Sequence, residues 1–126
     1  PCDETKQFIT MNGKEVSKFV ARVLPQYVED MIADAGMKAE DIDYLIPHQA
    51  NLRIIHAVQE RLGYSDDKVV TNIKNYGNTS AASIPLALAE SVEQGKVKLG
   101  STAILCGFGA GMTWGGAIVR LREGIC

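Results

Sequence analysis

Two polar segments of this chain carry side chains that could stabilise a negatively charged oxygen. His48 lies in residues 46–53, and Asn78 lies in residues 76–83. Each segment follows a short apolar run and precedes a helical pattern, and α/β folds place their active sites at such junctions. A histidine N–H and an amide N–H that meet there form a donor pair for a developing oxyanion.

Both residues also have purely structural interpretations. His48 could cap a helix or fill a polar gap, which is how we interpret His56 in the middle of the next helix. Asn78 follows Gly77, and local sequence favours a turn for this pair. The helix N-terminus beside His48 favours neutral imidazole, which can donate one N–H without giving up a full proton. Three polar neighbours further favour a functional His48: Gln49, Asn51 and Arg53.

A third segment, residues 107–116, is rich in glycine and follows an apolar run. It lacks the spacing of a dinucleotide-binding loop, and a strand pattern rather than a helix comes after it. Glycines permit positive φ, so the segment could expose backbone N–H groups to an oxyanion. A plain tight connection between two strands explains it equally well.

None of the three cysteines has the setting of a catalytic nucleophile, which needs a partly exposed and electropositive environment. Cys2 and Cys126 lie at the chain ends, and Cys106 lies in an apolar strand pattern. Their number and spacing predict neither a disulfide framework nor a metal site, which favours a reducing compartment such as the cytoplasm. The residues therefore predict oxyanion stabilisers without an attacking group.

Composition indicates one globular domain. The chain has 126 residues, of which 46% are hydrophobic, and a formal net charge of -2. This charge gives no general attraction to nucleic acid or to an anionic membrane, so we expect neither partner. Residues 101–119 are uncharged and long enough to span a membrane, but their glycines favour two buried strands joined by a glycine loop. The absence of an initiator methionine suggests a piece of a longer protein or a processed product.

Periodicity and helix-end signals predict an α/β fold, with a layered mixed sheet and flanking helices. Thr79 or Ser80 is a suitable N-cap for the third helix. The expected elements are a strand at 7–11, a helix at 14–35, a strand at 43–46, a helix at 50–62, an extended segment leading from 69 to 76, a helix from 79 or 80 to 94, and antiparallel strands at 102–106 and 117–121.

Three motifs, in order, resemble the C-terminal half of the β-ketoacyl-acyl carrier protein synthase III family, which initiates type II fatty-acid synthesis. They are PHQANLR at 47–53, GNTSAAS at 77–83, and GFGAG at 107–111 followed by TWG at 113–115. The resemblance implies a thiolase-like fold of two related α/β halves. It also implies decarboxylative condensation of an acyl-CoA primer with malonyl-acyl carrier protein (malonyl-ACP), without a cofactor or metal.

The resemblance further implies a Cys-His-Asn triad whose cysteine belongs to the N-terminal half. His48 and Asn78 would bind the malonyl thioester carbonyl and stabilise the enolate. The loop amide at Gly109 and Ala110 would help stabilise the tetrahedral oxyanion. Further positions match the pantetheine tunnel and the basic patch that docks acyl carrier protein: Gly13, Ala50 and Asn51 for the tunnel, and Arg53 and Lys18 for the patch.

Residues 1–126 would then form a C-terminal thiolase-like domain, part of a homodimeric enzyme when full length. We expect this chain alone to be unable to catalyse condensation, and to associate with the missing half through an exposed apolar face. Two alternatives stay open: another condensing enzyme (polyketide, alkylquinolone or hydroxymethylglutaryl-CoA synthase type), or a non-catalytic module that binds carrier protein or CoA. The runs at 79–83 and 113–115 favour the fatty-acid type.

Overall fold

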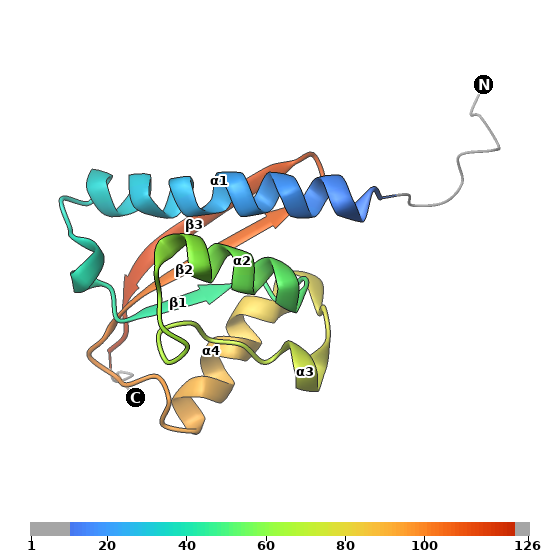
Figure 1. Ribbon diagram of the computed structural model, residues 1–126. Helices are drawn as coiled ribbons and strands as arrows, with labels where there is room; N and C mark the ends of the chain where they lie inside the picture. Colours follow the sequence, from blue (N-terminus) through green and yellow to red (C-terminus); the bar gives the residue numbers. More distant parts are fainter. Residues whose placement is uncertain (1–10, 123–126) are drawn as a thin grey trace.

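The centre of the molecule is a three-stranded sheet with strand order β1-β2-β3 (Figure 1). The computed structural model describes residues 11–122. The strands are β1 (Tyr44–Pro47), β2 (Thr102–Gly109) and β3 (Thr113–Arg120). β1 runs parallel to β2, and β2 pairs antiparallel with β3. This arrangement confirms the predicted mixed sheet.

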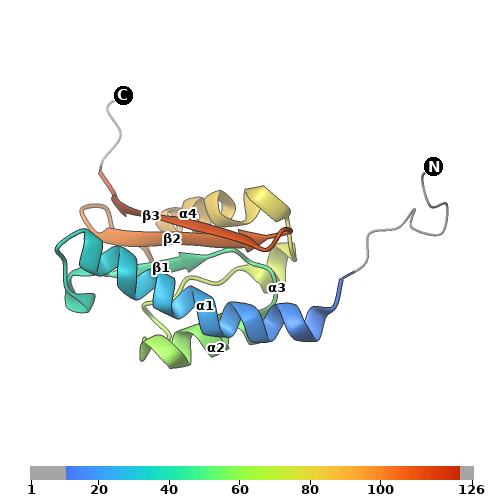
Figure 2. The same cartoon turned by 90° about the horizontal axis from the view of Figure 1, so that it is seen from above.

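Helices cover both faces of the sheet. Figure 2 shows α1 (Gly13–Asp34) and α2 (Leu52–Leu62) on one face and α4 (Ser83–Glu93) on the other. The remaining elements are short: α3 (Ile73–Tyr76) and the 3₁₀ turns η2 (Ala39–Asp41) and η3 (Ser80–Ala82). The molecule therefore has three layers, helix–sheet–helix.

Alternating side chains of the strands fill two separate cores. Leu45 and Ile104 pack toward α1 and α2, whereas Ile46 and Ala103 pack toward α4. This alternation is the period of two that a strand imposes on its side chains. Each of these side chains is at most 1% exposed. Full burial of a leucine or isoleucine side chain contributes roughly 1.5–3 kcal/mol to folding.

Two asparagines begin the helices of the first layer. Asn12 caps α1, where its side chain accepts a hydrogen bond from the Glu15 N–H at 3.3 Å. Asn51 caps α2 and accepts from the Arg53 N–H at 2.9 Å. Such a cap satisfies one of the free N–H groups of the first turn. The helices predicted at 14–35 and 50–62 are confirmed within two residues at each end.

The segment between α2 and α4 differs from the prediction. Only its start is extended, where Val69 forms a parallel bridge with Leu45. Residues 73–76 form the helix α3 instead of an extended segment. Their i to i−4 hydrogen bonds begin at the Asn72 carbonyl, which accepts from the Tyr76 N–H at 3.3 Å. Four residues are too few to show a helical apolar period, so no sequence pattern revealed this helix.

The start of the third helix was also predicted too early. α4 begins at Ser83, and neither Thr79 nor Ser80 makes a capping hydrogen bond to it. Ser80 has a φ of 56°, which does not occur within a right-handed α-helix. The Asn78 side chain accepts from the Ser80 N–H at 2.9 Å and turns the chain there. The 3₁₀ turn η3 therefore precedes the α-helix.

The two final strands are longer than predicted, and only the first is buried. β2 is largely enclosed, whereas β3 is exposed along most of its length. The predicted glycine loop shrinks to residues 110–112, since Gly107, Gly115 and Gly116 belong to the strands. Within residues 11–122, no helix is long and apolar enough to cross a membrane.

Some predictions fall outside the described residues. The strand expected at 7–11 lies there except for Met11, as do Cys2 and Cys126.

Candidate active site

His48, Asn78 and Gly109 meet beside the carboxyl ends of strands β1 and β2. His48 directly follows β1, Gly109 ends the parallel strand β2, and Asn78 lies between α3 and η3. All three line one pocket of about 260 Å³, together with the side chains of Ile84 and Phe108. Because β1 and β2 are parallel, their carboxyl ends lie side by side, which brings together segments that are distant in the sequence.

His48 is held from three sides. Its backbone N–H donates to the Cys106 carbonyl at 2.8 Å. Its ring Nδ1 lies 2.5 Å from Ser83 Oγ, and the Phe108 ring packs edge-on with a centroid distance of 5.5 Å. Burial lowers the pKa of His48 below its ordinary value of 6.5. The imidazole is therefore neutral near pH 7 and can donate an N–H while keeping its proton.

The amide nitrogen of Asn78 has no hydrogen-bond partner among residues 11–122 and can act as a donor. Its side chain is exposed, and its Oδ1 accepts from the Ser80 N–H at 2.9 Å. Within the amide, only the oxygen can accept a hydrogen bond from an N–H group, so this contact fixes the orientation of the Asn78 amide. The turn interpretation of Asn78 is thus correct, and it leaves the two Nδ2 hydrogens available to a ligand.

Gln49 ties the segment after β1 to the segment that leads toward Asn78. Its side chain is completely buried. Nε2 donates to the carbonyls of Pro47 at 2.7 Å and Val70 at 3.3 Å, and Oε1 accepts from the Asn72 N–H at 3.0 Å. Both amide hydrogens and the amide oxygen therefore have partners, which makes Gln49 a rigid link beneath the pocket.

The glycine-rich segment contributes a strand end rather than a long loop. Gly109 lines the His48 pocket, whereas Ala110 is exposed in the turn and does not line it. The Ala110 carbonyl accepts from the Thr113 hydroxyl at 3.2 Å, which stabilises the turn. This turn does not precede a helix, so the dinucleotide-loop interpretation has no structural support.

Cys106 is not a nucleophile. Its side chain is 1% exposed, and desolvation raises the pKa of the thiol to about 12. The thiolate is the reactive form, so this cysteine is inert near neutral pH. Within the described part of the chain, no group of three His, Cys, Asp or Glu side chains could hold a metal ion.

A second hollow, of about 540 Å³, gathers four of the predicted binding residues. Gly13, Lys18, Asn51 and Arg53 line it, between the first turns of α1 and α2. Ala50 does not line it; this half-buried residue donates its backbone N–H to the His48 carbonyl at 2.9 Å. The predicted pantetheine and carrier-protein positions therefore line one hollow, with the exception of Ala50.

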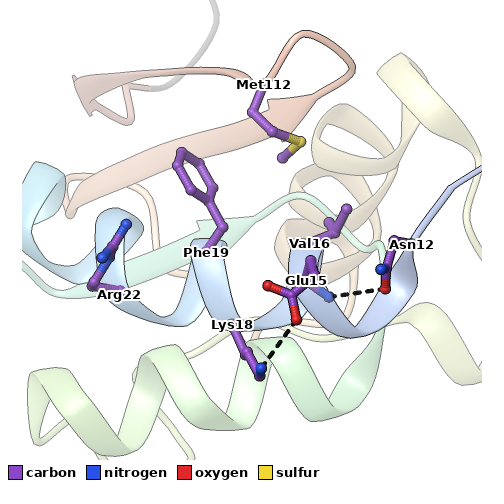
Figure 3. A pocket seen from close by; sticks show the side chains of 7 residues that line it. All are labelled: Asn12, Glu15, Val16, Lys18, Phe19, Arg22 and Met112. Carbon is purple, nitrogen blue, oxygen red and sulfur yellow. Dashed lines mark hydrogen bonds and ion pairs between the residues drawn. The ribbon is translucent and has the colours of Figure 1, made fainter.

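A groove of about 530 Å³ lies on the other side of Lys18, between α1 and the turn after β2. Figure 3 shows Phe19 and Met112 approaching it from opposite sides and the Lys18 ammonium paired with Glu15. That ion pair is 3.0 Å long and exposed, so it contributes little to stability. Arg22 also lines the groove. Its spacing of four from Lys18 was the sequence signal that could have assigned it to the same helix face.

The two side chains that touch the His48 ring were not predicted from the sequence. Ser83 and Phe108 lie within the motifs at 77–83 and 107–111, but no role was assigned to either. Ser83 is 35 positions from His48 in the sequence, so no local pattern could have predicted the contact.

Comparisons with known proteins show the family and the fold to which the chain is similar. The family model for the C-terminal domain of 3-oxoacyl-[acyl-carrier-protein] synthase III matches residues 32–121. The chain is 49% identical over 117 residues to a β-ketoacyl-[acyl-carrier-protein] synthase III of Clostridium perfringens, which covers 93% of the chain and 36% of that protein. It is 52% identical over 122 residues to the chloroplastic synthase III of Arabidopsis thaliana, covering 97% of the chain and 30% of that protein.

A crystal structure of the Thermus thermophilus synthase III has the same thiolase-like fold. It superposes with a TM-score of 0.84 at 50% identity, over 91% of this chain and 35% of that one. The chain thus spans about a third of the length of the relatives that it matches. The sequence match, the shared fold and the family model together show that this chain belongs to the β-ketoacyl-[acyl-carrier-protein] synthase III family, in which it corresponds to the C-terminal part.

Proposed function

We propose that residues 1–126 form the C-terminal domain of a synthase that condenses an acyl-CoA primer with malonyl-ACP and thereby starts fatty-acid synthesis. The observation that carries this proposal is the shared pocket of His48 and Asn78 at the carboxyl ends of β1 and β2. Two neutral N–H donors in one pocket suit an oxygen that gains negative charge during a reaction.

In the proposed reaction, the malonyl thioester oxygen accepts hydrogen bonds from the His48 ring and the Asn78 amide. The bond between the malonyl carboxylate and its α-carbon breaks, CO₂ leaves, and the electron pair forms an enolate on that oxygen. Neutral imidazole supports this step because it holds its proton more firmly than imidazolium does. The enolate then stays unprotonated and keeps its nucleophilic carbon.

The enolate carbon next attacks the acyl group that the primer has transferred to a cysteine. A carbon–carbon bond forms, and the thiolate leaves after a tetrahedral intermediate collapses. We assign this cysteine to the part of the synthase outside this chain, since buried Cys106 is inert. Backbone N–H groups near Gly109 and Ala110 would stabilise the tetrahedral oxyanion, and the place of Gly109 in the pocket supports this role.

An open apolar hollow is the proposed docking place of the remaining part of the synthase. It measures about 530 Å³, lies between α4 and β3, and is lined by Ile84, Leu105, Phe108 and Trp114 among others. Trp114 is 44% exposed, which is unusual for so large an apolar side chain. A homodimeric assembly and a cytoplasmic location belong to the same proposal. The cysteine spacing supports a reducing compartment.

The experiment that tests this function uses the complete protein that carries this sequence. Incubated with acetyl-CoA and malonyl-ACP, it should release CO₂ and form acetoacetyl-ACP, detected by mass spectrometry of the carrier protein. The chain of 126 residues on its own should form no product. Carrier-protein binding without CO₂ release by the complete protein would contradict the proposal and favour a non-catalytic binding module.

The hollow at the first turns of α1 and α2 is the proposed entrance for the phosphopantetheine arm. Gly13, Asn51 and Ala50 would contact the arm, and Lys18 and Arg53 would bind the acidic carrier protein. The four residues that line one hollow support this assignment. Arg53 is exposed and makes no ion pair with another described residue, so its charge is available to a partner.

We expect Arg53→Glu to weaken binding of acyl carrier protein roughly 10-fold at low salt, because a rim cation becomes a repelling anion. Titration calorimetry at two ionic strengths measures the effect, which should shrink as salt rises. Arg61→Glu is the matched control, since it makes the same change in net charge on α2 but does not line the hollow. Equal losses for the two variants would contradict the docking assignment.

A further inference from the structure

We infer that Ser83 is a positioning residue whose hydroxyl donates to His48 Nδ1 and thereby keeps the ring proton on Nε2. The inference rests on the proposed function in one respect, that the His48 ring N–H is the donor to the thioester oxygen. Ser83 is the first residue of α4, and its side chain is 1% exposed.

Two groups contact the Ser83 hydroxyl oxygen. The backbone N–H of Gln49 lies 3.2 Å from Oγ, and His48 Nδ1 lies 2.5 Å from it. The Gln49 N–H can only donate, so the hydroxyl oxygen accepts from it. The contact with Nδ1 is the one whose direction is open, because neutral imidazole carries its proton on either nitrogen.

The number of hydrogens on the Ser83 hydroxyl, the Gln49 N–H and the imidazole decides which group donates in the contact between Ser83 and His48. If Nδ1 donated, the hydroxyl oxygen would accept twice, and the hydroxyl hydrogen would be buried without an acceptor among residues 11–122. A buried donor without a partner costs free energy comparable to a lost hydrogen bond or more. If the hydroxyl donates to Nδ1, then the Ser83 hydroxyl, the Gln49 N–H and His48 Nδ1 each have a hydrogen-bond partner. The proton of the neutral ring then lies on Nε2.

The rest of the surroundings hold the ring in this orientation. Phe108 packs edge-on against it, with an interplanar angle of 71°. Nε2 has no hydrogen-bond partner within the described part of the chain, so it is the nitrogen left for a ligand.

The tautomer matters because the two ring nitrogens would meet the substrate differently. Nε2–H attracts a carbonyl oxygen and attracts the enolate oxygen more strongly. An unprotonated Nε2 would instead direct a lone pair at that oxygen and repel it. Ser83 therefore acts on the decarboxylation step rather than on carrier-protein binding.

Nitrogen NMR of the complete protein, labelled with ¹⁵N at histidine, tests this inference. The His48 ring signals are identified by their loss in His48→Gln. We expect a single neutral tautomer with the proton on Nε2, and in Ser83→Ala we expect both tautomers to be detectable. Ser91→Ala removes another buried serine of α4 and should leave the His48 signals unchanged. A proton on Nδ1 in the unmodified protein, or an unchanged ratio in Ser83→Ala, would overturn the inference.

Kinetics supplies the second measurement. Ser83→Ala should lower the single-turnover rate of malonyl-ACP decarboxylation about 2- to 10-fold, the size of one net hydrogen bond. Carrier-protein affinity should stay unchanged, and an equal loss of affinity would contradict the inference. The NMR result needs no turnover. A fixed Nε2–H tautomer in a protein that forms no condensation product would therefore contradict the proposed function and still support the role of Ser83.

Discussion

Replacing His48 or Asn78 with alanine in the complete synthase is expected to slow malonyl-ACP decarboxylation by about 10²–10³-fold, the usual effect of losing one oxyanion donor. The two side chains line one pocket, and each presents an N–H without a partner among the described residues. Release of CO₂ in a single turnover, measured with labelled malonyl-ACP, reports the step directly. Transfer of the primer from CoA to the cysteine forms no enolate and should fall less.

Matched controls exist for both variants. His56 is the second histidine of the chain and is exposed on α2, so His56→Ala should keep the rate. Asn75 is exposed on α3, three positions before Asn78, and Asn75→Ala should also keep it. The double variant should lose less than the product of the two single losses, because both donors serve one oxygen. A rate within a factor of about three of the unmodified protein for either single variant would refute the donor-pair assignment.

Gln49→Ala is expected to destabilise the fold by about 3 kcal/mol or more. The substitution leaves the Pro47 and Val70 carbonyls and the Asn72 N–H without their partner. Each buried group left unsatisfied costs roughly 1–3 kcal/mol. Since a domain of this size is stable by only about 5–15 kcal/mol, the loss is a large share of the total.

Urea unfolding followed by circular dichroism measures this change in the free energy of unfolding. Gln26→Ala is the control, since Gln26 is exposed on α1 and makes one side-chain bond, to Asp30 at 3.0 Å. That variant should change stability by less than about 0.5 kcal/mol. A loss below about 1 kcal/mol for Gln49→Ala would show that water replaces the amide and that the link beneath the pocket is dispensable.

Apolar periodicity was enough to predict the long helices and the sheet, and it failed where contacts across the chain decide the structure. α1 and α2 have apolar stripes within their own sequence, so their bounds were predicted within two residues, although the capping roles of Asn12 and Asn51 were not. The beginning of α4 depends on the side chain of Asn78, which binds the Ser80 N–H before the helix starts. A capping preference for Thr79 or Ser80 could not reveal this.

Two neighbouring glycines of β3 also differ in a way that local sequence cannot predict. A Cβ on Gly116 would lie 2.7 Å from the Leu105 carbonyl and 3.0 Å from the Met31 sulfur, whereas a Cβ on Gly115 would meet nothing within 4 Å. Gly116 therefore permits α1 to approach the sheet, and Gly115 does not serve this purpose. The two residues are indistinguishable in the sequence because the difference lies in what packs against each.

The candidate donors were predictable from motifs, but their supports were not. His48 and Asn78 each follow a recognisable local pattern. The Asn78 amide is oriented locally, by the Ser80 N–H two positions away. The hydrogen bonds around His48, by contrast, join Ser83 to residues 34 and 35 positions away, and Gln49 binds Asn72 across 23 positions. A single sequence carries no record of such pairings, so the network beneath the pocket emerged only with the structure.

The parallel pairing of β1 with β2 also has a consequence for synthesis of the chain. Tyr44 pairs with Ala103, so β1 leaves the ribosome about 3–12 seconds before its partner at usual elongation rates. During that interval β1 has an unpaired edge that could join another strand. The Cys106 carbonyl that anchors the His48 backbone does not yet exist. The pocket therefore cannot form before residues 106–109 have left the ribosome, and a translational pause between residues 48 and 102 would prolong the interval in which β1 is unpaired.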